Sequence, residues 1–304
     1  MMLSAVRRPL KAFFELVSSI GAERAVAKHG ARGSTLILAY HNVIPERTRA
    51  GGDASLHLGF DQFRRQLDVL ARCTRMVSIE DALRRCADTQ SRDDRPLLAI
   101  SFDDAYDSAV SIALPELAAR SVPATVFVAP ALLGATSTWW DAYLGHALRE
   151  SDDRRTFALE SLSGDTSRIT EYAIANGWTA GTVAAIASEA ALTDAAALPG
   201  VTFGAHSMTH PNLARLTPDR LAWELAASHD WLRARFDVFR PWLAYPYGLT
   251  TPDVERAAME AGYSAAFLVD GAWAMGQGSP FARPRLNVAS GVSDRGFLLR
   301  LARR

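Results

Sequence analysis

Short apolar runs alternate with amphipathic segments along most of this 304-residue chain. Continuous apolar runs joined by helices are typical of a parallel sheet that is covered on both faces. The sequence therefore predicts an α/β fold with about seven strands. The expected strands are 35–40, 96–102, 124–128, 201–205, 242–245, 265–269 and 285–288, and the clearest helical patterns are 60–72, 218–236 and 252–261.

Residues 137–198 interrupt this alternation. They are rich in alanine and polar residues, have helical patterns, and separate two expected strands by far more than a usual crossover. We interpret them as a largely helical insertion over one face of a barrel. The barrel domain itself is expected to span 31–304, and no internal repeat is apparent in it.

The first 30 residues are expected to form a separate amphipathic helical segment, with its helix over 9–28. Its apolar run at 12–20 contains Glu15 and is too short to cross a bilayer. It also lacks the long apolar stretch and the cleavage site of a signal peptide. These features predict a cytoplasmic protein whose N-terminal helix can contact a membrane surface.

Composition excludes two classes of function. Lys+Arg and Asp+Glu both number 33, so the formal charge is zero and the chain lacks the basic surface of a nucleic-acid binder. The two cysteines, Cys73 and Cys86, are too few for a disulfide scaffold or a cysteine-rich zinc site. We expect a neutral substrate and no nucleic-acid partner; the sequence does not indicate an oligomeric state.

Polar side chains follow four of the expected strands at their carboxyl ends. His41 follows the first, the pair Asp103 and Asp104 the second, and His206 and Tyr247 two later ones. In barrels of parallel strands, the loops after the strand ends carry the chemistry. The sequence therefore predicts that these side chains meet at one end of the barrel.

His206 and His210 are four positions apart in the sequence. In a helical turn, both imidazoles would point to one side, which is a common arrangement for binding one metal ion. The alternative is that one histidine lies on the surface and the other caps a helix. Spacing alone does not decide between these, but the position directly after a buried strand favours the metal site.

Asp103 and Asp104 are adjacent carboxylates at the end of a buried strand. Such a pair is costly unless a positive group compensates it, and one carboxylate can ligate a cation while the other accepts a proton. The alternative is a helix N-cap with an acidic first turn. With the histidines they complete a His-His-carboxylate set suited to hydrolytic zinc, although cobalt, nickel or iron would also accept it.

Three motifs resemble those of polysaccharide deacetylases, the NodB-homology group of carbohydrate esterase family 4. Residues 101–105 (Ser-Phe-Asp-Asp-Ala) resemble the first motif, usually Thr-Phe-Asp-Asp-Gly, and 206–210 match the second, His-Ser/Thr-x-x-His. Residues 244–248 (Ala-Tyr-Pro-Tyr-Gly) resemble the third, and 123–128 the strand that follows the first. The resemblance covers roughly residues 35–290. It implies a deformed (β/α) barrel and metal-dependent removal of acetyl groups from N-acetylglucosamine-type sugars.

The resemblance also implies roles for individual residues. Asp103 would be the general base, Asp104, His206 and His210 the metal ligands, and the backbone N–H of Tyr247 the oxyanion contact. Two positions depart from the family pattern. Ala105 replaces the usual glycine, and Ala244 stands where an arginine normally pairs with the base. Arg283 and Arg285 are the candidates to replace that arginine.

The family's C-terminal Leu-x-His motif, which supplies a general acid, is absent, since no histidine follows His229. Residues Tyr40 and His41 on the first expected strand resemble a Tyr-His motif found in some exopolysaccharide deacetylases, as if the last motif had moved to the front. His41 then becomes the candidate general acid. The alternative is a strand-end histidine bonded to a backbone carbonyl.

Three functions remain open on the sequence. The first is a metal-dependent hydrolase that removes N-acetyl groups from a polysaccharide or oligosaccharide. The second is the same reaction on a small or lipid-linked N-acetyl sugar, and the third is a carbohydrate-binding pseudoenzyme, which Ala105 and Ala244 favour. Trp139 and Trp140 begin the insertion and could either stack on sugar rings or pack in the core.

Overall fold

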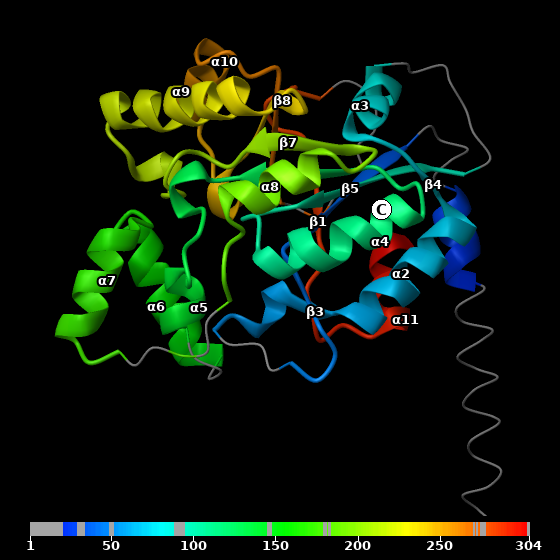
Figure 1. Cartoon of the computed structure of the whole chain (residues 1–304), viewed down its shortest axis with the longest axis horizontal. Helices are drawn as coiled ribbons and strands as arrows, with labels where there is room; N and C mark the ends of the chain where they lie inside the picture. Colours follow the sequence, from blue (N-terminus) through cyan, green and yellow to red (C-terminus); the bar gives the residue numbers. More distant parts are fainter. Residues whose placement is uncertain are drawn as a thin grey trace, which may run out of the picture.

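A computed structural model describes residues 21–28, 34–48, 52–87, 95–144, 148–178, 181, 184–269, 271, 273 and 278–302. Its main sheet is wholly parallel, in the order β10-β1-β5-β6-β7-β8-β9, with the short β4 beside β5. The expected α/β barrel of about seven strands is confirmed (Figure 1). The strands are β1 (Thr35–Tyr40), β4 (Arg75–Met76), β5 (Leu97–Phe102), β6 (Ala124–Val128), β7 (Val201–Ala205), β8 (Phe239–Ala244), β9 (Ala265–Phe267) and β10 (Leu286–Asn287). A second, two-stranded sheet pairs β2 (Asn42–Ile44) with β3 (His57–Gly59).

The central strands are apolar because both of their faces are buried. Every residue of β1, β5 and β6 is buried, which explains why these segments read as continuous apolar runs. Their registers bring the strand ends together, since Tyr40 pairs with Phe102 and Phe102 with Val126. The loops that follow β1, β5, β6 and β7 therefore leave the sheet at one edge.

The two outer strands of the path, β9 and β10, are joined through residues 283–288. Arg283 forms a parallel bridge with Phe267 of β9, and its N–H donates to Ala266 O at 3.0 Å. A few residues later, Val288 N donates to Ala39 O of β1 at 2.9 Å. One short segment thus contacts β9 at its start and β1 at its end. This narrow seam closes the sheet between β9 and β1.

Helices cover the outside of the barrel. They are amphipathic as the sequence predicted: the buried residues of α2 (Phe60–Cys73) include Phe63, Leu67 and Leu70, at helical spacing. Ser78 precedes α3 and its hydroxyl accepts the N–H of Asp81 at 3.1 Å, as expected for an N-cap. The other covering helices are α3 (Ile79–Ala87), α4 (Leu114–Ala119) with the π-helical turn η2 (Ala109–Ala113), α8 (Glu189–Ala196), α9 (Pro218–Arg235), α10 (Pro252–Glu260) and α11 (Asp294–Ala302).

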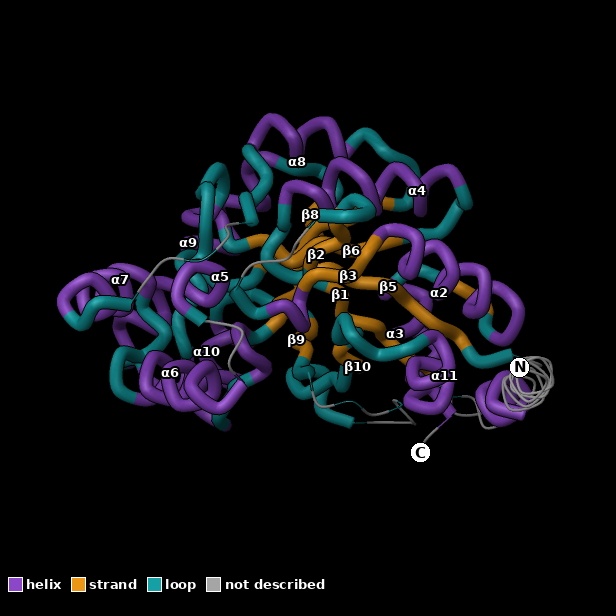
Figure 2. Tube along the Cα trace, turned by 90° about the horizontal axis from the view of Figure 1, so that it is seen from below, coloured by secondary structure: helices purple, strands orange, loops and turns teal. Residues whose placement is uncertain are grey.

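The segment between β6 and β7 holds α5 (Trp139–Tyr143), α6 (Leu148–Glu160) and α7 (Thr166–Ala175). These three helices form a group at one side of the barrel in both views (Figures 1 and 2). The chain then returns through α8, which packs on η2 and β7 as a crossover helix does. Short 3-10 helices occur at η1 (Ala54–Leu56), η3 (Pro130–Leu132), η4 (Leu213–Arg215) and η5 (Pro246–Gly248).

Most of the expected N-terminal amphipathic helix lies outside the described residues. Residues 21–28 are helical, and Ala22 and Val26 pack into the main core. Among the described residues, no helix combines the length and the apolarity that a membrane span requires. Cys73 is a buried free thiol, and the side chain of Cys86 lies outside the described residues.

Candidate active site

All six candidate site residues line one cavity of about 520 Å³ at the carboxyl ends of the strands. The sequence placed them together correctly. Three residues of α6, Asp152, Arg155 and Leu159, also line this cavity, so the β6–β7 segment forms part of its wall. The full set from the strand ends is His41, Asp103, Asp104, His206, His210 and Tyr247.

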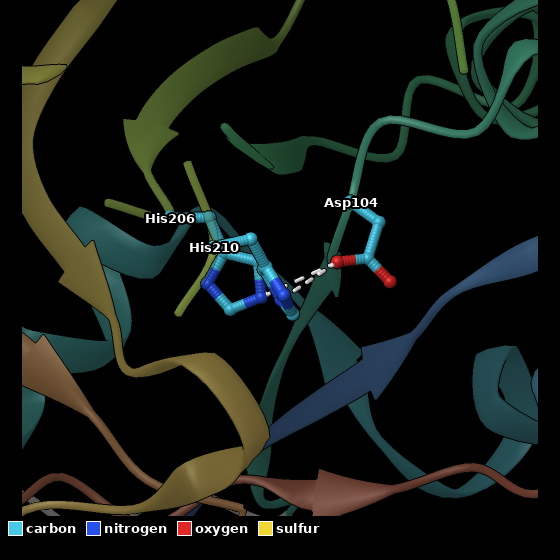
Figure 3. A group of neighbouring side chains, drawn as sticks. All are labelled: Asp104, His206 and His210. Atoms are coloured by element: carbon cyan, nitrogen blue, oxygen red, sulfur yellow. Dashed lines mark ion pairs between the residues drawn. The ribbon is translucent and has the colours of Figure 1, made fainter. Parts of the chain in front are cut away.

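Asp104, His206 and His210 turn one atom each toward a common point (Figure 3). Asp104 Oδ1 lies 3.1 Å from His210 Nε2 and 3.5 Å from His206 Nε2, and the three atoms lie within 4.8 Å of one another. All three side chains are buried. Within the described part of the chain, Asp104 Oδ1 has no hydrogen-bond partner. A buried carboxylate oxygen without a donor is expensive, so the group fits a cation.

The hydrogen bonds of the two rings support the same conclusion. His206 Nδ1 lies 2.7 Å from Ala244 O. Because a carbonyl oxygen only accepts, Nδ1 must carry the proton, and Nε2 is left with a lone pair. Burial, and then the neighbouring His210, lower the pKa of His206 to about 4. Burial likewise lowers the pKa of His210 to about 4, so both rings are neutral and able to ligate at neutral pH.

The loop that carries the histidines is not a helical turn, and the predicted helical geometry is wrong. Ser207 has φ 58° and His210 has φ 61°, both in the left-handed region. The Ser207 hydroxyl accepts the N–H of His210 at 3.0 Å and closes the turn. A tight loop with two left-handed residues brings the two rings together, with their centroids 4.6 Å apart.

A buried glutamate that the sequence reasoning missed holds this loop. Glu224 of α9 is fully buried, and its Oε2 accepts the N–H groups of Met208 and Thr209 at 2.9 and 2.8 Å. Its Oε1 accepts Arg220 at 2.8 Å and the Thr209 hydroxyl at 2.5 Å. The signal was present in the sequence, since Glu224 is a charged residue on the apolar face of α9, between Leu221 and Leu225.

Asp103 is held by Arg285, one of the two arginines that the sequence offered. Arg285 Nη1 and Nη2 donate to the two carboxylate oxygens at 2.6 and 2.8 Å, and both side chains are buried. Burial acts to raise the pKa of Asp103, but the charge of Arg285, with a further contribution from His206, outweighs it. The pKa is therefore held well below its usual range. Asp103 is ionised, as a base requires.

The pKa of Asp104 is shifted in the opposite direction, upward. Burial raises its pKa to about 6, and the neighbouring His206 and His41 oppose this shift only in part. The two adjacent aspartates therefore have different electrostatic surroundings. Asp104 and Ala105 have φ 68° and 55°. This left-handed backbone at 105 explains why glycine is usual there, and excludes the alternative of a helix N-cap at this pair.

The remaining residues also have defined surroundings. His41 Nδ1 is buried and lacks a hydrogen-bond partner among the described residues, which does not match the alternative of a bond to a backbone carbonyl. Tyr247 itself has φ 61°, so its backbone within η5 is in the left-handed region. Trp139 and Trp140 are 1% and 2% exposed, which favours core packing over an exposed sugar platform. Trp140 nevertheless reaches the cavity wall.

Comparison with known proteins agrees with this fold. Residues 90–266 match the family model for polysaccharide deacetylases. The chain belongs to the polysaccharide deacetylase family. This membership supports a hydrolase that deacetylates carbohydrate, and confirms the resemblance seen in the three motifs. A comparison with curated proteins found no match.

Several solved structures share the fold at low sequence identity. The deacetylase PplD of Streptococcus pyogenes, solved in complex with acetate, is 18% identical with a TM-score of 0.62, over 88% of this chain and 98% of that one. IcaB from Ammonifex degensii is 19% identical with a TM-score of 0.64, over 89% and 97%. The BpsB deacetylase domain from Bordetella bronchiseptica is 16% identical with a TM-score of 0.57, over 85% and 96%.

Proposed function

We propose that this chain is a metal-dependent hydrolase that removes N-acetyl groups from an amino sugar of a polysaccharide or oligosaccharide. The observation that carries the proposal is the arrangement in one cavity of three converging ligand atoms beside an aspartate held by an arginine. A structural ion pair alone would not leave a buried carboxylate oxygen and two imidazole lone pairs facing one another.

The donor set of one carboxylate and two neutral imidazoles suits zinc, with cobalt, nickel and iron as alternatives. A divalent cation held by Asp104, His206 and His210 would polarise the acetyl carbonyl and make water a better nucleophile.

The protein groups account for the proton transfers. Asp103, ionised beside Arg285, takes a proton from the water as its oxygen bonds to the acetyl carbon. The backbone N–H of Tyr247 donates to the carbonyl oxygen as that atom gains negative charge. His41 then gives a proton to the nitrogen as the carbon–nitrogen bond breaks. The products are acetate and a free amino sugar.

The test is acetate release together with metal analysis of the purified protein. The substrates are a panel of N-acetylated polymers, chito-oligosaccharides and lipid-linked N-acetyl sugars, with Asp103→Asn as the inactive control. We expect bound metal in about equimolar amount and acetate release from polymer or oligomer. Release from the lipid-linked or small sugars alone would change the substrate class. Metal-loaded protein that releases acetate from none of them would be a binding protein rather than an enzyme.

A further inference from the structure

The first helix of the β6–β7 segment, α5, contacts one of the candidate metal ligands directly. Trp139 Nε1 donates to the Tyr247 hydroxyl at 3.1 Å. The ring of the next residue, Trp140, lies against the ring of His210, with centroids 4.6 Å apart. Both tryptophans are buried. The helix is therefore packed onto the site rather than merely lying over it.

The hydroxyl of Tyr247 joins α5 to His210. It lies 3.1 Å from His210 Nδ1 and donates its one proton to His210 O at 3.2 Å. With the hydroxyl proton assigned to His210 O, which can only accept, Nδ1 of the ring is the donor to the hydroxyl. Nε2 of His210 is then left with a lone pair directed at the candidate metal position. Trp139 occupies the remaining acceptor direction of the hydroxyl and holds the phenol in place.

A buried polar cluster anchors α5 to the barrel. Asp141 of α5 is fully buried, and its Oδ1 accepts His57 Nε2 at 2.9 Å. Its Oδ2 accepts the hydroxyls of Tyr106 at 2.6 Å and Thr138 at 3.1 Å. The loop before η1 approaches so closely that a Cβ at Gly52 would lie 2.1 Å from Asp141 Cα. These contacts leave α5 no room to shift without disturbing the barrel.

The two candidate histidine ligands are thus oriented by different parts of the chain. The barrel orients His206, through the carbonyl of Ala244 at the end of β8. We infer that α5 orients His210: Trp139 acts through Tyr247 as a positioning residue that sets the tautomer and direction of the ring. This inference rests on the proposed function, and it makes α5, which begins the helical insertion predicted from the sequence, an integral part of the candidate metal centre.

The experiment measures metal binding rather than turnover. Metal-free wild-type protein and the variants Trp139→Phe and Tyr247→Phe are titrated with Co²⁺ and Zn²⁺ against a competing chelator, and the Co²⁺ absorption spectrum is recorded. Loss of a hydrogen-bond partner behind a metal ligand typically costs about 10–100-fold in affinity. We expect losses of this size in both variants, with a changed Co²⁺ spectrum.

Matched controls separate positioning from general destabilisation. Trp273→Phe removes an indole N–H that donates to Leu301 O, and Tyr263→Phe removes a buried hydroxyl that donates to Leu225 O. Neither residue lines the cavity. We expect wild-type affinity and spectrum in both controls. If Trp139→Phe does not fold, Tyr247→Phe, which lacks only one oxygen atom, decides the question.

The outcomes distinguish this inference from the proposed function. Wild-type affinity and spectrum in folded Trp139→Phe and Tyr247→Phe would overturn the positioning role while leaving the proposed function intact. Equal losses in the variants and the controls would also overturn it, because they would reflect stability alone. A wild-type protein that binds neither cation would contradict the proposed function and this inference with it.

Discussion

Arg285 and Asp103, which are 182 positions apart in the chain, form a bidentate ion pair. The guanidinium is fully buried, and it also donates to the Ser101 hydroxyl and to Leu268 O, each at 3.1 Å. Its planar fork fixes both oxygens of the carboxylate. The candidate base therefore has a set direction, although the position that carries this arginine in most of the family is Ala244 here.

Replacing Arg285 with glutamine is expected to move the acid limb of the pH–rate profile to higher pH. Arg285 lowers the pKa of Asp103, and without it burial, which raises this pKa, would be opposed only by His206 and His41. In the wild type, the depressed pKa gives stability that is present above the usual aspartate range and is lost only as pH falls through the lower folded value. The variant loses this contribution, and an unpaired buried carboxylate costs about 3–5 kcal/mol.

The measurements are kcat/KM for acetate release against pH, and chemical unfolding at neutral pH. Arg283→Gln is the control, because Arg283 lies on the same segment and was the other candidate from the sequence. We expect it to keep the wild-type acid limb. An unchanged acid limb in Arg285→Gln would mean that the arginine does not set the ionisation of the base.

Replacing Asp103 or Asp104 with asparagine should impair different steps: turnover in the first variant and metal binding in the second. Asp103→Asn removes the base but no ligand, so it should bind metal normally and turn over very little. Asp104→Asn removes an anionic ligand, so it should bind metal weakly and regain part of its activity in excess metal. Metal titration beside acetate release checks both. Rescue of Asp103→Asn, and not of Asp104→Asn, would reverse the two roles.

Alanine at either histidine, His206 or His210, should abolish stoichiometric metal while the fold persists. The two rings and Asp104 converge on one position, and no other described group of His, Cys, Asp or Glu side chains offers such a set. Metal content and far-UV circular dichroism of the purified variants check this. Retention of equimolar metal in both variants would show that the ligand set is wrong.

His41→Ala should slow turnover and leave metal bound. A general acid typically contributes about 10²–10⁴-fold to the rate. His229→Ala is the matched control, since His229 lies on α9 and does not line the cavity. The rates should be compared over a range of pH. Equal turnover in His41→Ala and the wild type at every pH would remove His41 from the mechanism.

Glu224→Gln should destabilise the fold by about 2–3 kcal/mol and loosen the histidine loop. The carboxylate accepts two backbone N–H groups, and each hydrogen bond to a charged group contributes about 1.5–3 kcal/mol. Glutamine keeps only one acceptor oxygen, so its NH₂ would face either the two backbone N–H groups or Arg220 and the Thr209 hydroxyl, and it cannot accept from them. Urea unfolding checks the change, with the exposed Glu260→Gln as control. A difference between the two variants below about 0.5 kcal/mol, the usual range for surface substitutions, would contradict the role of Glu224.

The fold and most of the site could be predicted because they depend on local patterns. Fully buried strands appear as apolar runs, and parallel strands bring their following residues to one edge, so the sequence alone was enough to group His41, Asp103 and His206. The predicted helical turn at His206 was wrong because spacing does not reveal left-handed backbone. Trp139 and Tyr247 could not be connected, since their bond joins segments 108 positions apart.

The seam between β9 and β1 has a consequence for how such sites change over time. A closed ring of strands has no first or last member, so neighbours in space need not be neighbours in the chain. Arg285 donates to Leu268 O, which follows β9, the strand that pairs with β8 and its Ala244. The guanidinium of Arg285 nevertheless reaches the carboxylate of Asp103, which an arginine at position 244 would otherwise bind. A charged group that is absent from β8 is thus supplied by the segment on the far side of β9, and it binds the same carboxylate. Searches that require a fixed motif order would overlook enzymes that have made this exchange.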